Sequence, residues 1–457
     1  MDFAQPLLAA LDLIMREAAL FAAVGFLLLG LSDLAVDTIW IGRALWRRAR
    51  GATDLCLADL PAPTRPGRIA IFTPAWDEAD VIGDMLRNTL RSFDHGDYRI
   101  YVGCYPNDPA TIAEVRRVAD PRVRLVVGTR LGPTTKADCL NRLWEAMLAD
   151  ECAEGAKFKA VVLHDAEDVV HPAELCVFDS MIERYDLVQL PVRPLIDPSS
   201  RWIAGHYADE FSESHAKEMV VREALGAALP SAGVGCAFAR EALARIAAGG
   251  APFDADSLTE DYELGLKLAA AGGTATFLRL RDPDGRLVAT EEYFPPTMTA
   301  AVSQKARWVT GIALSGWDRL GWRGGLAERW MRLRDRQSVL AALCLGAGYA
   351  SFAFWALLKL PEAMTDWAPQ PIAARLALIL QINLAMLGWR LAMRFGFVAQ
   401  AYGWREGLRS IPRVLVGNVI SIRAAWRALV RYREIRGSGV ARWHKTAHAF
   451  PASIPAE

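Results

Sequence analysis

Three stretches of the chain are apolar over the length that a lipid bilayer requires. They cover residues 18–40, 338–360 and 372–391. About 20 predominantly apolar residues are needed for a helix to cross the hydrocarbon core. We therefore predict three transmembrane helices. The first stretch is too long for a signal peptide and lacks a small-residue cleavage pattern.

The distribution of arginines predicts the orientation of these helices. Four arginines lie at 43–50, directly after the first stretch, whereas the residues before it are poor in positive charge. Because basic flanks stay in the cytoplasm, we expect the N terminus outside and residues 43–337 inside. This is the topology of a multi-pass protein of the bacterial inner membrane. A fourth apolar segment, 411–432, carries arginines throughout and is predicted to lie on the membrane surface.

Two acids lie within the first predicted span. Asp33 and Asp37 are four residues apart and therefore share one face of a helix. They either pair with nearby arginines at the cytoplasmic rim or form a polar face inside a helix bundle or along a polymer path.

Between the spans, short apolar runs alternate with helical patterns. Residues 68–73, 99–105, 123–128 and 159–164 are predicted strands, and residues 79–90, 111–118 and 136–148 are predicted helices. This order predicts an α/β fold with a mostly parallel sheet, in which ligands bind beyond the carboxyl ends of the strands. We expect three parts: 1–50, a transmembrane helix with its basic flank; 51–330, a cytoplasmic domain; and 331–457, two transmembrane helices, the surface helix and a basic tail.

Composition narrows the class of protein. The 457 residues contain 52 Lys+Arg and 52 Asp+Glu, so no overall positive field points to nucleic acid, and we expect no nucleic-acid partner. The seven cysteines are odd in number and scattered, without a CxxC pair, as expected in a reducing compartment.

An acidic loop follows the strand predicted at 159–164. Asp165, Glu167 and Asp168 lie within four residues of one another. Carboxylates this close repel one another unless a cation lies among them. The loop therefore predicts a Mg²⁺ or Mn²⁺ site that would neutralise a diphosphate leaving group, the alternative being a solvated acidic turn.

Other polar residues follow the first two strands or begin a helix. Asp77 and Glu78 follow the first strand and Asp108 follows the second. Each either accepts hydrogen bonds from a base or ribose, or serves only as a helix cap or turn. Lys136 begins a helix, where the dipole disfavours a lysine unless an anion compensates. We predict a diphosphate contact there, the alternative being a solvated surface lysine.

Two further motifs supply candidates for the chemistry of transfer. Thr259-Glu260-Asp261 begins a helix, and Asp261, with Glu260 beside it, is the predicted base for an acceptor hydroxyl. Both acids could instead merely favour the positive end of the helix. Gln304, Arg307 and Trp308 share one helical face, and an aromatic ring beside a guanidinium suits a sugar and a phosphate. The alternative role for this face is an anchor at the membrane interface.

These motifs, in this order, resemble those of the family 2 glycosyltransferases of the GT-A fold, which include cellulose and hyaluronan synthases. Residues 74–78, 164–172 and 304–313 are similar to the phage-adsorption protein B group of that family. The resemblance implies a nucleotide at Asp77 and Asp108, a diphosphate at Lys136, a metal ion at Asp165 and Glu167, a base at Asp261, and an acceptor site at Gln304, Arg307 and Trp308. Glu167 stands where the family has a second aspartate, so either Glu167 or Asp168 completes the metal site.

The expected activity is therefore metal-dependent, inverting transfer from a nucleotide-diphosphate sugar, a UDP-sugar, to a growing surface polysaccharide. Because only three spans are predicted, we expect an export partner or a homo-oligomer. Two alternatives remain open: transfer of a single sugar to a lipid-phosphate carrier, and a membrane receptor or scaffold with an inactive transferase site.

Overall fold

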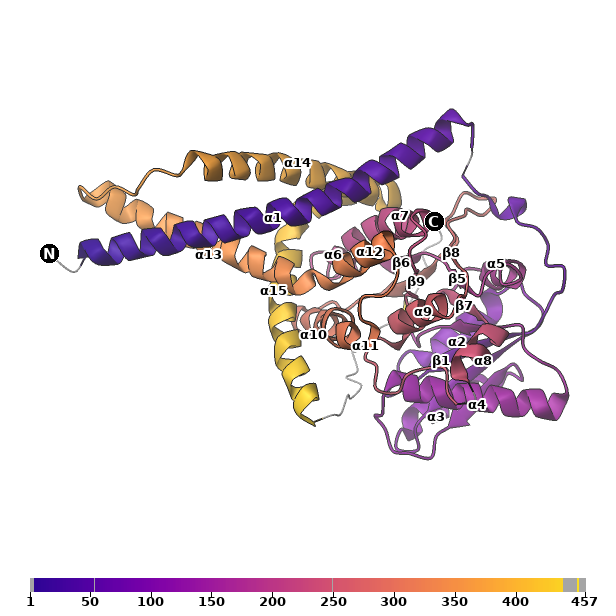
Figure 1. Cartoon of the computed structure of the whole chain (residues 1–457). Coiled ribbons are helices and arrows are strands. Elements are labelled where there is room, and N and C mark those ends of the chain that lie inside the picture. The colour runs from indigo at the N-terminus through magenta and orange to yellow at the C-terminus, as the bar shows by residue number, and fades with distance from the viewer. Residues whose placement is uncertain (1–3, 53, 249, 439–449, 452–457) are drawn as a thin grey trace.

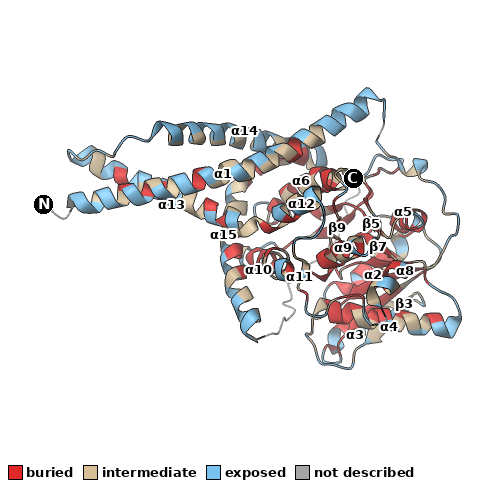
Figure 2. Ribbon diagram, in the orientation of Figure 1, coloured by how far each residue is buried: buried red, intermediate tan, exposed pale blue. Residues whose placement is uncertain are grey.

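The structure is a computed structural model that describes residues 4–438, except 53 and 249, together with residues 450–451. Three long helices extend from one side of an α/β domain (Figure 1): α1 (Ala4–Ala49), α13 (Ser338–Met364) and α14 (Ala374–Tyr402). All three are long and apolar enough to cross a membrane. α1 and α13 contain the first two stretches predicted to be transmembrane, and α14 contains the third except its first two residues. Much of the surface of these helices is exposed, as Figure 2 shows.

The spans pack closely on one another. At Gly25 of α1, an added Cβ would overlap the Cys344 side chain of α13, so only glycine permits this approach. The two acids of α1 pair with basic residues. Asp33 pairs with Arg390 and lies 3.0 Å from Arg334, whereas Asp37 accepts hydrogen bonds from Lys217 Nζ (2.6 Å) and from a tryptophan of α14. The prediction that arginines pair with these acids is thus correct for Asp33, whereas the charged partner of Asp37 is Lys217 of η2 (Ser214–Glu218).

The central sheet has seven strands in the order β3-β2-β1-β4-β7-β5-β8. The four strands β1 (Ile69–Pro74), β2 (Tyr98–Cys104), β3 (Val123–Val127) and β4 (Ala160–Leu163) are parallel. They are completed by β5 (Leu187–Gln189), β8 (Ala275–Phe277) and the antiparallel β7 (Cys236–Ala239). Strands β6 (Val192–Leu195) and β9 (Thr290–Tyr293) form a separate parallel pair. The prediction of a mostly parallel sheet is confirmed.

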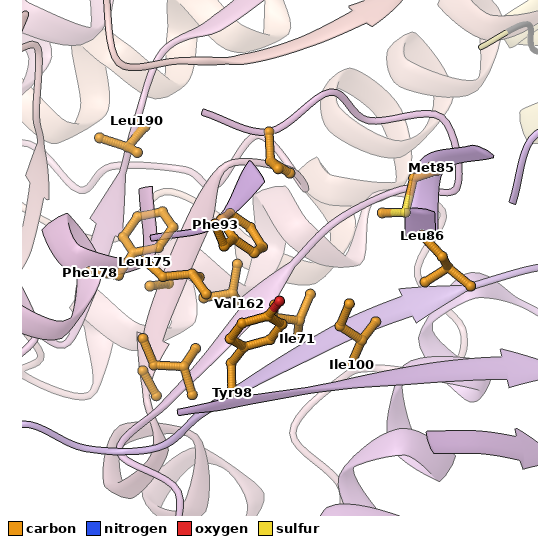
Figure 3. Close-up of a cluster of buried hydrophobic side chains, with 14 of the residues drawn as sticks. Ile71, Met85, Leu86, Phe93, Tyr98, Ile100, Val162, Leu175, Phe178 and Leu190 are labelled. Atoms are coloured by element: carbon orange, nitrogen blue, oxygen red, sulfur yellow. The ribbon is translucent and has the colours of Figure 1, made fainter. Parts of the chain in front are cut away.

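Helices cover both faces of the sheet. They are α2 (Ile82–Ser92), α3 (Pro109–Val118), α4 (Lys136–Glu154), α5 (Glu174–Met181), α8 (Arg240–Ala247) and α9 (Glu260–Ala270). Successive residues of a strand point to opposite faces, so Ile71 and Phe72 of β1 enter two different cores. Figure 3 shows the first core, where Ile71 and Val162 lie among the side chains of α2 and α5, including Met85 and Phe178.

Shorter helices connect this domain to the spans. They are α6 (Gly205–Glu213), η2 (Ser214–Glu218), α7 (Met219–Ala224), α10 (Met298–Trp308), η3 (Val309–Ser315), α11 (Gly316–Leu320) and α12 (Leu326–Arg336), while η1 (Leu57–Asp59) follows α1. The last helix, α15 (Trp404–Ser438), runs across the ends of the spans in Figure 1. It buries Ala424 and Ala428 against Ala306 of α10. Its predicted position on the membrane surface stays a prediction.

Candidate functional site

A polar cavity lies beyond the carboxyl ends of β1 and β4, where the parallel sheet is expected to bind its ligand. Three sequence motifs that lie far apart along the chain meet there. Nine of the residues predicted from the sequence line the cavity: Glu78, Lys136, Asp165, Glu167, Glu260, Asp261, Gln304, Arg307 and Trp308. Asp77, Asp108 and Asp168 are not among its lining residues.

The acidic loop divides into residues that line the cavity and a residue that supports them. Asp165 and Glu167 line the cavity, whereas Asp168 is fully buried behind them. Asp168 Oδ2 accepts hydrogen bonds from His164 Nδ1 (2.7 Å) and from the Asp165 N–H (3.0 Å). Of the two residues that could complete a metal site, Glu167 therefore lines the cavity and Asp168 does not.

His164 holds this loop from inside the domain. Its two ring nitrogens lie 2.7 Å from carboxylate oxygens of Asp168 and Glu174, and all three side chains are fully buried. Burial disfavours the imidazolium, but the two carboxylates outweigh it and raise the pKa of His164 to about 10. The ring thus joins the acidic loop to α5. The sequence places His164 in the motif, but this supporting role depends on Glu174, ten residues away.

A further acid of the cavity was missed in the sequence analysis. Strand β9 places Glu292 in the cavity wall, where it is buried. Burial, and then the charges of Asp168, Glu167 and Asp165, raise the pKa of Glu292 well above its ordinary value. The feature of the sequence that could have identified Glu292 was the adjacent pair Glu291-Glu292. Strand alternation sends one of them outward to Arg193 (2.6 Å) and the other inward.

The predicted base, Asp261, lies in the first turn of α9. Its Oδ1 accepts a hydrogen bond from the neighbouring Tyr262 N–H (2.8 Å), so the acid does contact the positive end of the helix. Burial raises the pKa of Asp261, against the opposing charges of Lys136 and Arg307. Burial and the charge of Asp261 likewise raise the pKa of Glu260 to about 7. A raised pKa is what a carboxylate base requires to accept a proton near neutral pH.

The N-cap residue of α9, Thr259, packs closely against η3. Thr259 makes no side-chain cap bond, and its Oγ1 is buried without a hydrogen-bond partner among the described residues. A Cβ at Gly311 of η3 would lie 2.5 Å from that oxygen, so only glycine allows this approach. This contact brings η3, which directly follows α10, against the start of α9.

Helix α10 supplies the opposite wall of the cavity. Gln304, Arg307 and Trp308 all face it, as their spacing predicted. Within the described part of the chain, no group donates a hydrogen bond to the buried Gln304 Oε1. Trp308 lies against Tyr207 and Phe294, with ring centroids 6.0 Å and 6.4 Å away. The wall thus combines an aromatic surface, a guanidinium and an amide.

Lys136 begins α4 and extends into the cavity. Only 13% of its side chain is exposed, and its Nζ lies 2.5 Å from Asp165 Oδ1. Burial disfavours the ammonium, but the carboxylates of Asp165, Glu260 and Asp261 outweigh it and raise the pKa of Lys136. The alternative of a solvated surface lysine is therefore wrong.

Asp108 connects two loops at the sheet edge. Its Oδ2 accepts a hydrogen bond from the Asp77 N–H (2.6 Å), and its Oδ1 accepts one from the Thr111 N–H (3.3 Å) at the start of α3. This is the capping role that the sequence left open for Asp108. Asp77 does not cap α2, which begins at Ile82 after the N-cap Val81. Its side chain is exposed, at a backbone φ of 57°.

The charge of the cavity suits a divalent cation. Six lining carboxylates, those of Glu78, Asp165, Glu167, Glu260, Asp261 and Glu292, face two lining cations, Lys136 and Arg307. Carboxylate oxygens are the ligands that Mg²⁺ and Mn²⁺ prefer. Within the described residues, no three His, Cys, Asp or Glu side chains already converge as metal ligands. The donor set therefore fits a metal ion in its chemistry, while Asp165 is turned to Lys136.

Comparison with known proteins identifies a matching family and two similar proteins. Residues 66–311 match the family described as glycosyltransferase like family 2. The chain is 35% identical to bacteriophage adsorption protein B of Escherichia coli K12 and to bacteriophage N4 adsorption protein B of Escherichia coli O157:H7. Each alignment covers 96% of this chain and 62% of the relative, so the chain spans less than two thirds of their length.

Solved structures with a similar arrangement have lower identity. The mannosyltransferase PcManGT from Pyrobaculum calidifontis, in complex with GDP-Man and Mn²⁺, is 19% identical with a TM-score of 0.49. The similarity covers 88% of this chain and 99% of that one. Glucosyl-3-phosphoglycerate synthase from Mycobacterium tuberculosis, in complex with Mn²⁺, UDP and glucosyl-3-phosphoglycerate, is 16% identical with a TM-score of 0.36, over 57% of this chain and 82% of that one.

Proposed function

Because this chain belongs to the family 2 glycosyltransferases, we propose that it transfers a sugar from a nucleotide-diphosphate donor, a UDP-sugar, to a growing surface polysaccharide. The observation that carries the proposal is the cavity itself. Acids from three motifs face Lys136 and Arg307 beyond the carboxyl ends of the strands. This arrangement suits a diphosphate held by cations beside a carboxylate that can accept a proton.

The residues of the cavity take distinct roles in this reaction. Asp165 and Glu167 would hold a Mg²⁺ or Mn²⁺ ion, which neutralises the diphosphate when bound. Lys136 and Arg307 bind diphosphate oxygens from two sides, and the turn containing Asp77 and Glu78 receives the nucleoside. Asp168 keeps the acidic loop in place through His164.

The transfer step is a single displacement. Asp261 accepts the proton of the acceptor hydroxyl, and the freed oxygen attacks the anomeric carbon from the side opposite the diphosphate. The bond between that carbon and the diphosphate oxygen breaks as the new glycosidic bond forms, and the nucleoside diphosphate leaves. The configuration at the anomeric carbon is therefore inverted. The aromatic side of Trp308 supports the acceptor sugar, with Gln304 as a hydrogen-bond acceptor.

The proposal also places the site on the cytoplasmic side of the membrane, next to the spans. With the arginines of residues 43–50 inside, the α/β domain lies in the cytoplasm and the N terminus outside the inner membrane. Acceptor leaving the cavity at α10 would meet the spans directly. Three spans form a small bundle, so an export partner or a second copy of this chain would complete the path.

The proposal is tested by nucleotide release from purified protein in nanodiscs, with a panel of UDP- and GDP-sugars and with Mn²⁺ or Mg²⁺. We expect release from one donor only when metal is present. Asp165→Ala and Asp261→Asn should each lower turnover at least 100-fold, since each removes a group that acts on the reacting atoms. Asp284→Asn is the control, because that carboxylate is 75% exposed and outside the cavity lining. Full turnover by folded Asp261→Asn would refute the base.

A further inference from the structure

A second cavity lies between the α/β domain and the spans. Its walls come from α6, α10, η3, α13, α14 and α15, so it forms where the two parts of the molecule meet. Trp308 lines both this cavity and the polar cavity of the candidate active site. The two cavities are therefore neighbours on either side of one indole ring. The proposed transfer reaction uses none of the other residues of the second cavity.

The ionisable lining of this cavity is mainly positive. Lys305, Arg390 and Arg394 face a single lining carboxylate, Glu210, which pairs with Lys305. Arg394 lies 3.3 Å from Glu213 and Arg390 pairs with Asp33 of α1, but neither carboxylate belongs to the lining. A hydrogen-bonding group is also available: Ser338 Oγ is buried without a partner among the described residues. Cations together with a free hydroxyl are the donors that bind a phosphate group.

The remaining lining combines apolar residues of α13 and α15 with the polar Asn418 and Ser421 of α15. Leu345 of α13 and Val414 of α15 are among the apolar residues that line the cavity. The outer face of α15 carries a row of exposed large apolar side chains: Trp404, Leu408, Ile411, Leu415, Val419, Trp426 and Val430. Their spacing of three, four or seven residues places them on one side of the helix. Such a row is stable against lipid but unfavourable in water.

We propose that this cavity binds the phosphate group of a membrane lipid. The phosphate lies among Lys305, Arg390 and Arg394, with Ser338 as a donor, and the lipid chain follows the apolar surface between α13 and α15. Because α15 crosses the ends of the spans (Figure 1), a membrane around the spans would place the cavity at the depth of the lipid headgroups. A glycan attached to such a lipid would extend past Trp308 to the base. This last step rests on the proposed transferase function, whereas binding of the lipid does not.

Gly417 allows the cavity to be filled without altering any charge. It lines the cavity, and a Cβ at this position would meet no atom within 4 Å. Gly417→Leu therefore adds an apolar side chain in open space, and leucine also favours a helix over glycine. Gly388→Leu on α14 is the matched control, since its Cβ also meets nothing within 4 Å and the residue is exposed outside the cavity. Arg394→Gln tests the contribution of charge.

The measurement is equilibrium binding by native mass spectrometry of the full chain in an uncharged detergent. The probes are a polyprenyl monophosphate, the same polyprenol without phosphate, and inorganic phosphate. We expect the polyprenyl monophosphate to bind wild type and Gly388→Leu equally, and Gly417→Leu and Arg394→Gln at least tenfold more weakly. The polyprenol should not bind measurably, and inorganic phosphate should bind more weakly than the lipid.

Three results would overturn the inference. Equal binding of the lipid by wild type and Gly417→Leu would place the lipid elsewhere. Equal affinity for inorganic phosphate and for the lipid would reduce the site to one for the free ion. Equal affinity for the polyprenol and its phosphate would leave only an apolar groove. Because none of these results depends on nucleotide release, failure here is distinguishable from failure of the proposed transferase activity.

Discussion

Gly233 offers a direct test of the position of the proposed base. Its backbone φ is +82°, and an added Cβ would overlap Asp261 Oδ2 while lying 3.1 Å from Cγ and 3.4 Å from Cβ of the same side chain. The whole Asp261 side chain faces the glycine, so rotating the carboxylate tip alone does not make room. Gly233→Ala should therefore move the base away from the acceptor.

The size of the effect follows from two separate costs. An alanine held in the left-handed region costs about 1–2 kcal/mol of stability. Displacement of a reacting group by about 1 Å lowers the rate on the order of 100-fold. We expect Gly233→Ala to lower kcat about 100-fold with little change in the KM for the donor, because the substitution displaces the base and not Lys136, which is proposed to bind the diphosphate. Gly226→Ala is the control: its φ is +67° and its Cβ would meet nothing within 4 Å.

The assay is the initial rate of nucleotide release in nanodiscs, measured beside the Tm of each variant. Both variants should lose similar stability, and only Gly233→Ala should lose turnover. If both variants keep wild-type kcat, the placement of Asp261 against this loop has no catalytic consequence and the reasoning is refuted. If both lose turnover equally, the loss reflects backbone strain rather than displacement of the base.

Two other predictions concern pH and stability. Burial raises the pKa of Asp261, and the base acts only when it is ionised. On acidification, kcat/KM should therefore fall at a pH above about 3.9, the ordinary pKa of an aspartate. A pH–rate profile whose acid limb lies at that ordinary value would contradict this prediction. Lys217 is buried between Asp37 of α1 (2.6 Å) and Glu213 (3.2 Å), so Lys217→Met should destabilise the fold by about 3–5 kcal/mol. Chemical denaturation in detergent measures this loss. The double variant Asp37→Asn/Lys217→Met should recover part of it, and no recovery would mean that the pair is not the cause.

Much of the fold was predictable because its signals are local. Four strands were found within one or two residues, since buried parallel strands are continuous apolar runs between turns. The long spans were equally clear, since their length and composition depend on no distant partner. The short strands β5, β6 and β9 have three or four residues each, too few for a pattern to distinguish them from loops.

The sequence predicted which residues form the candidate site better than it predicted which way their side chains face. The acidic loop, the start of α9 and the end of α10 meet in one cavity, as their residue types indicated. Asp108 instead ties two loops together, and Glu292 was not identified. A carboxylate that lines a cavity and one that caps a helix have the same side chain, and only their neighbours distinguish them.

The sequence by itself determined that the chain has three apolar spans, a mostly parallel α/β domain, and acids and cations suited to a metal ion and a diphosphate. These properties follow from residue type and spacing within short windows. Only the tertiary structure decided that Asp168 turns inward to His164 while Glu167 faces the cavity. It also decided that Lys305, Arg390 and Arg394 line a second cavity. Such orientations depend on partners as distant as Glu174 of α5 or the helices α14 and α15, because a buried charge lies where another part of the chain compensates it.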